Sequence, residues 1–112
     1  MILFASKAAA TLALVVCLTA PAAAADIAAG REKAGACTPC HGPKGLAVAP
    51  DAPNLAGDSV YYLTAQLKAF RGGERRHEQM SIIAKGLSDE DIADLAAWFS
   101  AIDVTATLPK LK

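Results

Sequence analysis

Cys37-Thr38-Pro39-Cys40-His41 is the stretch that decides how this 112-residue chain is interpreted. Cys-x-x-Cys-His is the spacing at which c-type haem is attached to a polypeptide. The two thiols add across the vinyl groups of the porphyrin to form thioethers. Because His41 directly follows the second cysteine, its imidazole is delivered to one axial face of the iron. The motif therefore predicts one covalent haem, bonded to Cys37 and Cys40, with His41 as the proximal iron ligand.

Three other uses of the two cysteines were weighed against haem. A thioredoxin-like dithiol should lie in a βαβ pattern, and the sequence has no such pattern. A structural zinc site needs four ligands, and Cys37, Cys40, His41 and His77 are the only set that the predicted domain offers. That set would leave Met80 and a large apolar helix face unexplained. A disulfide between cysteines three residues apart closes too short a loop to stabilise a fold.

The N-terminal residues 1–25 are typical of a secretory signal. Lys7 supplies the positive charge, residues 8–20 form an apolar run, and small residues precede Asp26, where cleavage after residue 25 is predicted. The run is shorter than the about 20 residues that span a bilayer, which disfavours a retained anchor. Cys17 lies inside the run and is expected to be removed with it, in preference to serving as a lipid-attachment site. We therefore expect an exported, periplasmic domain of residues 26–112 with no membrane span after cleavage.

The hydrophobic pattern of residues 26–112 predicts an all-α domain with three main helices and a short helical segment. Helices are expected at residues 26–36, about 59–70, 80–84 and from residue 88 onward, with a Gly- and Pro-rich loop over residues 37–57. Asp58 or Ser59 is suited to cap the second helix, and Ser88 begins the last one with three acids in its first turn. The last helix carries one apolar stripe, formed by Ile92, Leu95, Ala96, Phe99 and Ile102.

Over residues 26–103 the chain resembles the class I c-type cytochromes, both the small bacterial monohaem proteins and single domains of their dihaem relatives. The motifs that carry this resemblance are Cys37-Thr38-Pro39-Cys40-His41-Gly42, Pro53-Asn54-Leu55-Ala56-Gly57, Tyr61-Tyr62, Gln66-Leu67, Phe70-Arg71-Gly72-Gly73, Met80, Leu87-Ser88-Asp89-Glu90-Asp91-Ile92 and Trp98-Phe99. The resemblance implies the class I cytochrome c fold, wrapped around one haem. It further implies that the first and last helices cross near Gly30 and Trp98. It also implies that the Pro53 carbonyl accepts the proton of His41 and so orients the ring.

The resemblance places Met80 as the distal iron ligand. Met80 is the only methionine besides Met1, and a thioether ligand favours ferrous iron and raises the reduction potential. Filling a gap in the core is the other role open to Met80. His77 is a competing ligand three residues away, although its polar surroundings favour a solvated side chain. An apolar wall around the haem is expected from Tyr62, Leu63, Leu67, Phe70, Ile83, Leu95 and Trp98.

A haem iron with both axial positions filled cannot bind substrate, so the sequence predicts outer-sphere electron transfer and no enzyme activity of its own. The expected partners are redox proteins: a dehydrogenase or quinol-oxidising complex as donor and an oxidase or reductase as acceptor. Lys68, Arg71, Arg75 and Arg76 form either a basic rim that steers such a partner or a solvated loop balanced by Glu74 and Glu78. The formal net charge of zero argues against nucleic-acid binding. A monomeric carrier is expected, with a dedicated subunit of a dehydrogenase complex and a ligand-binding or peroxidatic haem protein as alternatives.

Overall fold

The computed structural model describes residues 23–111 of the chain. The predicted signal segment, residues 1–25, lies outside the described residues except for its last three, which form exposed, extended chain ahead of the first helix. Within residues 23–111 the secondary structure is entirely helical, so the predicted all-α class is confirmed. No helix in this part of the chain is both long and apolar enough to cross a membrane.

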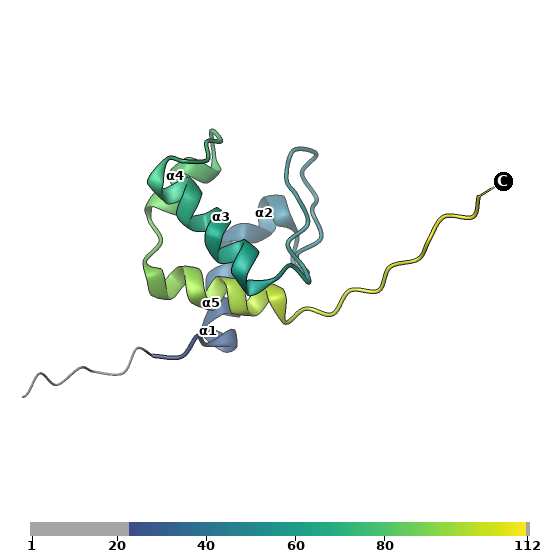
Figure 1. Ribbon diagram of the computed structural model, residues 1–112, viewed down its shortest axis with the longest axis horizontal. Helices are drawn as coiled ribbons and strands as arrows, with labels where there is room; N and C mark the ends of the chain where they lie inside the picture. The colour runs from purple at the N-terminus through teal and green to yellow at the C-terminus, as the bar shows by residue number, and fades with distance from the viewer. Residues whose placement is uncertain (1–22, 112) are drawn as a thin grey trace, which may run out of the picture.

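From Ile27 onward, three consecutive helical segments follow one another without a loop (Figure 1). Helix α1 spans Ile27–Lys33, a 3-10 turn η1 spans Ala34–Cys37, and α2 spans Thr38–His41. The Asp26 carboxylate caps α1 by accepting the N–H groups of Ala28 and Ala29. Our prediction that residues 37–41 form a loop was wrong. The only proline among them, Pro39, falls in the first turn of α2, where its missing N–H is not needed.

Two longer helices and one short helix complete the domain. Helix α3 spans Val60–Gly72. Ser59, one of the two residues predicted to cap it, accepts the N–H of Tyr62 with its hydroxyl. It ends at Gly73, whose φ of 87° lies in the left-handed region that glycine adopts without strain. Helix α4 spans Met80–Lys85. Helix α5 spans Asp89–Ser100 and begins with a capping box between Ser88 and Asp91.

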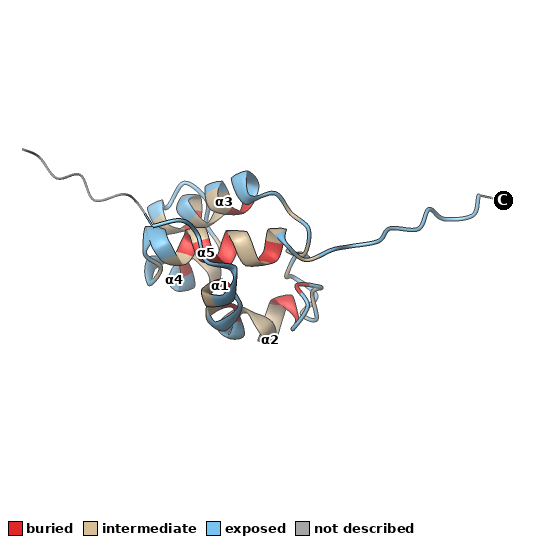
Figure 2. Cartoon of the chain, turned by 90° about the horizontal axis from the view of Figure 1, so that it is seen from below, coloured by how far each residue is buried: buried red, intermediate tan, exposed pale blue. Residues whose placement is uncertain are grey.

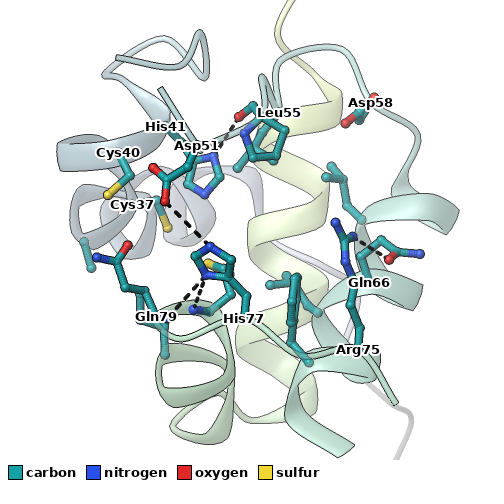
Figure 3. A pocket seen from close by; sticks show the side chains of 18 of the residues that line it. Cys37, Cys40, His41, Asp51, Leu55, Asp58, Gln66, Arg75, His77 and Gln79 are labelled. Atoms are coloured by element: carbon teal, nitrogen blue, oxygen red, sulfur yellow. Dashed lines mark hydrogen bonds and ion pairs between the residues drawn. The ribbon is translucent and has the colours of Figure 1, made fainter. Parts of the chain in front are cut away.

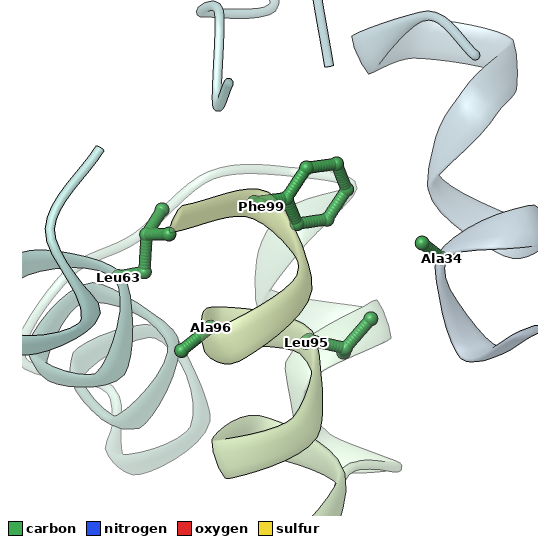
Figure 4. Packing of buried hydrophobic residues seen from close by; sticks show 5 residues of the cluster. All are labelled: Ala34, Leu63, Leu95, Ala96 and Phe99. Carbon is green, nitrogen blue, oxygen red and sulfur yellow. The ribbon is translucent and has the colours of Figure 1, made fainter. Parts of the chain in front are cut away.

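Helix α5 is the centre of the packing. Its contact with α1 is the most extensive contact between two elements of the described chain. Helix α3 packs against both α4 and α5. Figure 2 shows that the buried residues concentrate along α5, whereas the C-terminal segment is exposed. The core cluster consists of Ala34, Leu63, Leu95, Ala96 and Phe99 (Figure 4). Three of its five members come from α5, as the predicted apolar stripe requires.

The crossing of α1 and α5 depends on Gly30. A Cβ atom there would overlap the backbone carbonyl oxygen of Asp94 and would lie 2.9 Å from the Cβ of Trp98. Only glycine therefore allows the two helix backbones to approach this closely. The expected crossing near Gly30 and Trp98 is confirmed.

Candidate functional site

A cavity of about 220 Å³ opens between the η1–α2 segment, the loop that follows it, α3 and α4 (Figure 3). Most of its lining residues are apolar, and the polar ones include two thiols, two imidazoles and two carboxylates. The lining comprises Ala36, Cys37, Cys40, His41, Asp51, Ala52, Pro53, Leu55, Asp58, Tyr62, Leu63, Gln66, Leu67, Phe70, Arg75, His77, Gln79, Met80 and Ile83. The fold thus brings the predicted attachment motif and the predicted distal methionine to one cavity.

The two cysteines lie side by side on one side of this cavity (Figure 3). Cys37 ends η1 and Cys40 lies in α2, and residues three apart share one face of a helical segment. Both thiols are free and partly buried. Burial raises the pKa of the Cys37 thiol, because desolvation disfavours the thiolate. The helical turn therefore presents two unpaired sulfur atoms along one edge of an apolar space.

The imidazole of His41 is fixed in one orientation. The residue is 7% exposed, and its Nδ1 lies 2.8 Å from the carbonyl oxygen of Pro53. Because a carbonyl oxygen can only accept a hydrogen bond, Nδ1 carries the proton and Nε2 keeps its lone pair. The expected bond between His41 and Pro53 is present. It leaves Nε2 as the ring nitrogen free to bind a metal ion.

The wall formed by α4 carries Met80, which is the first residue of that helix and is half-buried. The backbone N–H groups of Gln79 and Met80 donate to Nδ1 of His77, over 3.3 and 3.4 Å. The Nε2 atom of His77 lies 3.7 Å from the Asp51 carboxylate on the loop that leads to Pro53. Both ring nitrogens of His77 are therefore engaged within the protein, whereas no residue in the described part of the chain donates a hydrogen bond to the Met80 thioether. This arrangement favours Met80 over His77 as a ligand.

The zinc alternative receives no support from the geometry. Among the residues that the structure describes, no three or more His, Cys, Asp or Glu side chains are grouped closely enough to hold a metal ion. Cys37, Cys40 and His41 border the cavity from the η1–α2 segment, whereas His77 borders it from the chain between α3 and α4.

Five of the seven predicted wall residues line the cavity. Tyr62, Leu63, Leu67 and Phe70 come from α3, and Ile83 comes from α4. The other two, Leu95 and Trp98, are not among the residues that line it. Leu95 belongs to the core cluster, and Trp98 lies at the α1 crossing, with the Arg31 guanidinium 5.8 Å from its ring centre.

Helical geometry explains why Trp98 lies outside the cavity. Successive residues on a helix are about 100° apart, so the turn of α5 that directs Leu95 and Phe99 into the core directs Trp98 toward α1. Sequence spacing alone places Trp98 on α5. It does not show which neighbour that side of the helix meets.

Several polar residues at the mouth of the cavity were not predicted as part of the site. Asp51, Asp58 and Gln79 carried no sequence signal, because they lie in a loop and at a helix end without a recognisable motif. Gln66 accepts a 2.6 Å hydrogen bond from the Nη1 atom of Arg75, whose guanidinium carbon lies 4.6 Å from the centre of the Phe70 ring. Arg75 is the one arginine among the described residues that line this cavity.

The predicted basic rim is only partly free. The Arg71 guanidinium donates to the carbonyl of Leu87, over 3.1 Å, and to the Asp89 carboxylate, over 2.6 Å. This pairing lowers the pKa of Asp89. Arg71 therefore joins α3 to the start of α5 and contributes little to a positive surface around the cavity.

Comparisons with known proteins agree with this geometry. The family model described as Cytochrome c matches residues 27–102. Cytochrome c-554(548) of Halomonas halodenitrificans is 49% identical over 81 residues, a match that covers 70% of this chain and 98% of that protein. The crystal structure of reduced cytochrome c4 from Pseudomonas stutzeri superposes with a TM-score of 0.66 and 36% identity, covering 71% of this chain and 47% of that one.

A third relative is named for its redox partner. The thiosulfate dehydrogenase electron acceptor of Stutzerimonas stutzeri is 41% identical over 69 residues, which cover 59% of this chain and 32% of that protein. The chain thus spans nearly all of the Halomonas protein, but only about half or less of the other two. The chain belongs to the cytochrome c family: within residues 23–111 it is all-helical, and it is an electron carrier that binds haem c covalently.

Proposed function

We propose that Cys37 and Cys40 form the thioether bonds to the haem and that His41 and Met80 are its two axial ligands. The observation that carries this assignment is the hydrogen bond from His41 Nδ1 to the Pro53 carbonyl, in a cavity that Met80 borders from α4. It fixes the tautomer in which Nε2 is the donor, and it strengthens that nitrogen as a ligand. When bound, the haem supplies a one-electron couple between ferric and ferrous iron.

The side chains around the cavity have separate tasks in this proposal. Tyr62 and Leu67, with the other apolar residues of α3, exclude water and keep the surroundings of the iron similar in both oxidation states. Arg75 lies at the mouth, where its guanidinium can pair with the negatively charged propionates of the haem. If His41 and Met80 both held the iron, no position on it would be open to exogenous ligands, and the protein would be limited to electron transfer.

The test compares Met80→Ala with Ile83→Ala in the holoprotein. Both residues belong to α4 and line the cavity, but only methionine can ligate iron. Met80→Ala should abolish the sulfur-to-iron charge-transfer band of the ferric protein, lower the reduction potential, and allow the ferrous protein to bind carbon monoxide. Ile83→Ala should keep the band and exclude carbon monoxide. An unchanged spectrum in Met80→Ala would show that another residue is the distal ligand.

We further propose that the protein is exported to the periplasm by the signal at residues 1–25 and acts there as a diffusible carrier. The extended, exposed conformation of residues 23–25 supports accessible processing before α1. The resemblance to a thiosulfate dehydrogenase electron acceptor supports the alternative of a cytochrome dedicated to one dehydrogenase. Gel filtration of the native protein from cell extracts distinguishes the two, since a carrier elutes as a monomer and a dedicated subunit co-purifies with its enzyme.

A further inference from the structure

A buried carboxylate at the crossing of α1 and α5 binds the backbone nitrogen at which the mature chain is expected to begin. Asp94 is 2% exposed, although it carries a charged side chain. Its Oδ1 atom accepts a 2.7 Å hydrogen bond from the N–H of Asp26, and its Oδ2 atom accepts one of 2.7 Å from Lys33. Neither Asp94 nor its partners line the cavity, so this carboxylate has no part in the site described above.

The charges around Asp94 are unbalanced. Lys33 also pairs with Asp91, over 2.9 Å. The Asp26 carboxylate caps the start of α1, on the residue whose N–H binds Asp94. Two carboxylates therefore share the ammonium group of Lys33, and one buried oxygen of Asp94 is bonded only to a neutral amide. A second cation at the Asp26 nitrogen would reduce this excess of negative charge.

We propose that Asp94 is a binding site for the N-terminal ammonium group that processing creates at Asp26. The inference rests on the proposed cleavage of the signal after Ala25. Hydrolysis of the Ala25–Asp26 peptide bond consumes one water molecule, releases Ala25 as a carboxylate, and leaves the Asp26 nitrogen as an amine that is protonated at neutral pH. That nitrogen already lies 2.7 Å from Asp94 Oδ1, so no rearrangement is needed to form an ion pair.

Of the segment that cleavage removes, the structure describes residues 23–25. They are exposed and lead away from the helices. Processing therefore exchanges a neutral N–H donor for a charged one at an almost fully buried acceptor. A charged donor adds to this hydrogen bond a Coulombic attraction to the carboxylate that a neutral N–H lacks. The mature N-terminus thus becomes a structural group that ties α1 to α5.

The pH dependence of this ion pair has a definite sign. The Asp94 carboxylate faces the ammonium directly, the Asp26 carboxylate is on the same residue, and Lys33, which also pairs with Asp91, opposes them. An ion pair with Asp94 favours the protonated form of the α-amino group, so the proposal requires a folded-state pKa above the about 7.7–8.0 of an unfolded chain. The added stability is complete below about pH 8 and is lost as the pH rises through the higher, folded-state pKa.

The test compares two holoproteins matured in a periplasm: the native chain and a variant with two alanines inserted after Ala25. Cleavage after Ala25 then leaves Asp26 with an amide nitrogen in the variant and an ammonium in the native protein. Intact mass first establishes the N-terminus of each form. Urea unfolding at pH 6.5 should give an unfolding equilibrium constant about fivefold larger for the extended form. At pH 10 the two forms should converge.

The same pair is then compared in an Asp94→Asn background, where the difference at pH 6.5 should disappear. Equal stability of the two native-background forms at pH 6.5 would overturn the proposal, and so would a difference that survives in Asp94→Asn. The pH comparison needs no Asp94 variant and decides the question even if Asp94→Asn does not fold. A native protein that begins at a residue other than Asp26 would refute the cleavage site and this inference together, while leaving haem attachment untouched.

Discussion

Replacing Gly30 by alanine should separate α1 from α5 and destabilise the fold, because the obstruction to a Cβ atom is rigid. The new atom would overlap the carbonyl oxygen of Asp94 and would lie 2.7 Å from the carbonyl carbon and 2.9 Å from Trp98 Cβ. None of these atoms can rotate away, because two belong to the backbone and the third is the first atom of its side chain. The helices must therefore move apart along the most extensive contact in the domain.

The magnitude follows from two opposing effects. Overpacking a tight interface costs about 1–3 kcal/mol, and the rigid neighbours place Gly30→Ala near the upper end of that range. Alanine gains about 0.8–1.0 kcal/mol over glycine inside a helix. The free energy of unfolding should therefore fall by about 2 kcal/mol.

Gly35→Ala is the matched control for this experiment. A Cβ at Gly35, two residues beyond the end of α1, meets no atom within 4 Å. The substitution should leave the protein as stable as the native form or stabilise it by up to about 1 kcal/mol. Urea unfolding of both holoproteins, followed by circular dichroism, measures the difference of about 2–3 kcal/mol that the two opposing effects predict. If Gly30→Ala were as stable as Gly35→Ala, close contact at the helix crossing would not be what requires glycine.

Two further predictions concern the start of α5 and the acid stability of the domain. Ser88→Ala removes the hydroxyl that caps the N–H of Asp91 and should lower the free energy of unfolding by about 1 kcal/mol. The control, Ser100→Ala, lies at the other end of the helix and should change this free energy little. Equal urea midpoints for the two variants would contradict the capping role. The Ser88 N–H, together with Lys33, lowers the pKa of Asp91 to about 2. Because this carboxyl has a higher pKa when unfolded, it contributes stability above about pH 4 that is lost as the pH falls toward 2. Lys33→Met should weaken this dependence in urea midpoints measured between pH 5 and pH 2, and an unaltered slope would show that the ion pair is not responsible.

Much of the fold could be predicted because its signals are local. Ser59 and Ser88 precede apolar helical patterns, and each caps the helix that follows it. The stripe on α5 predicted which of its faces forms the core. Residues 37–41 were mistaken for a loop, because the Gly- and Pro-rich stretch that follows them obscured a short continuation of the first helix.

The sequence by itself determined the chemistry of the site. Two thiols and an imidazole at fixed spacing specify haem attachment without any knowledge of the fold, because short-range spacing sets which of these groups one porphyrin can meet. Tertiary structure decided which other side chains surround that chemistry. It excluded Trp98 from the cavity, brought Asp51 within 3.7 Å of His77, and buried Asp94 against the Asp26 nitrogen. These contacts join residues from separate elements, so they depend on how the helices cross, which no local pattern encodes.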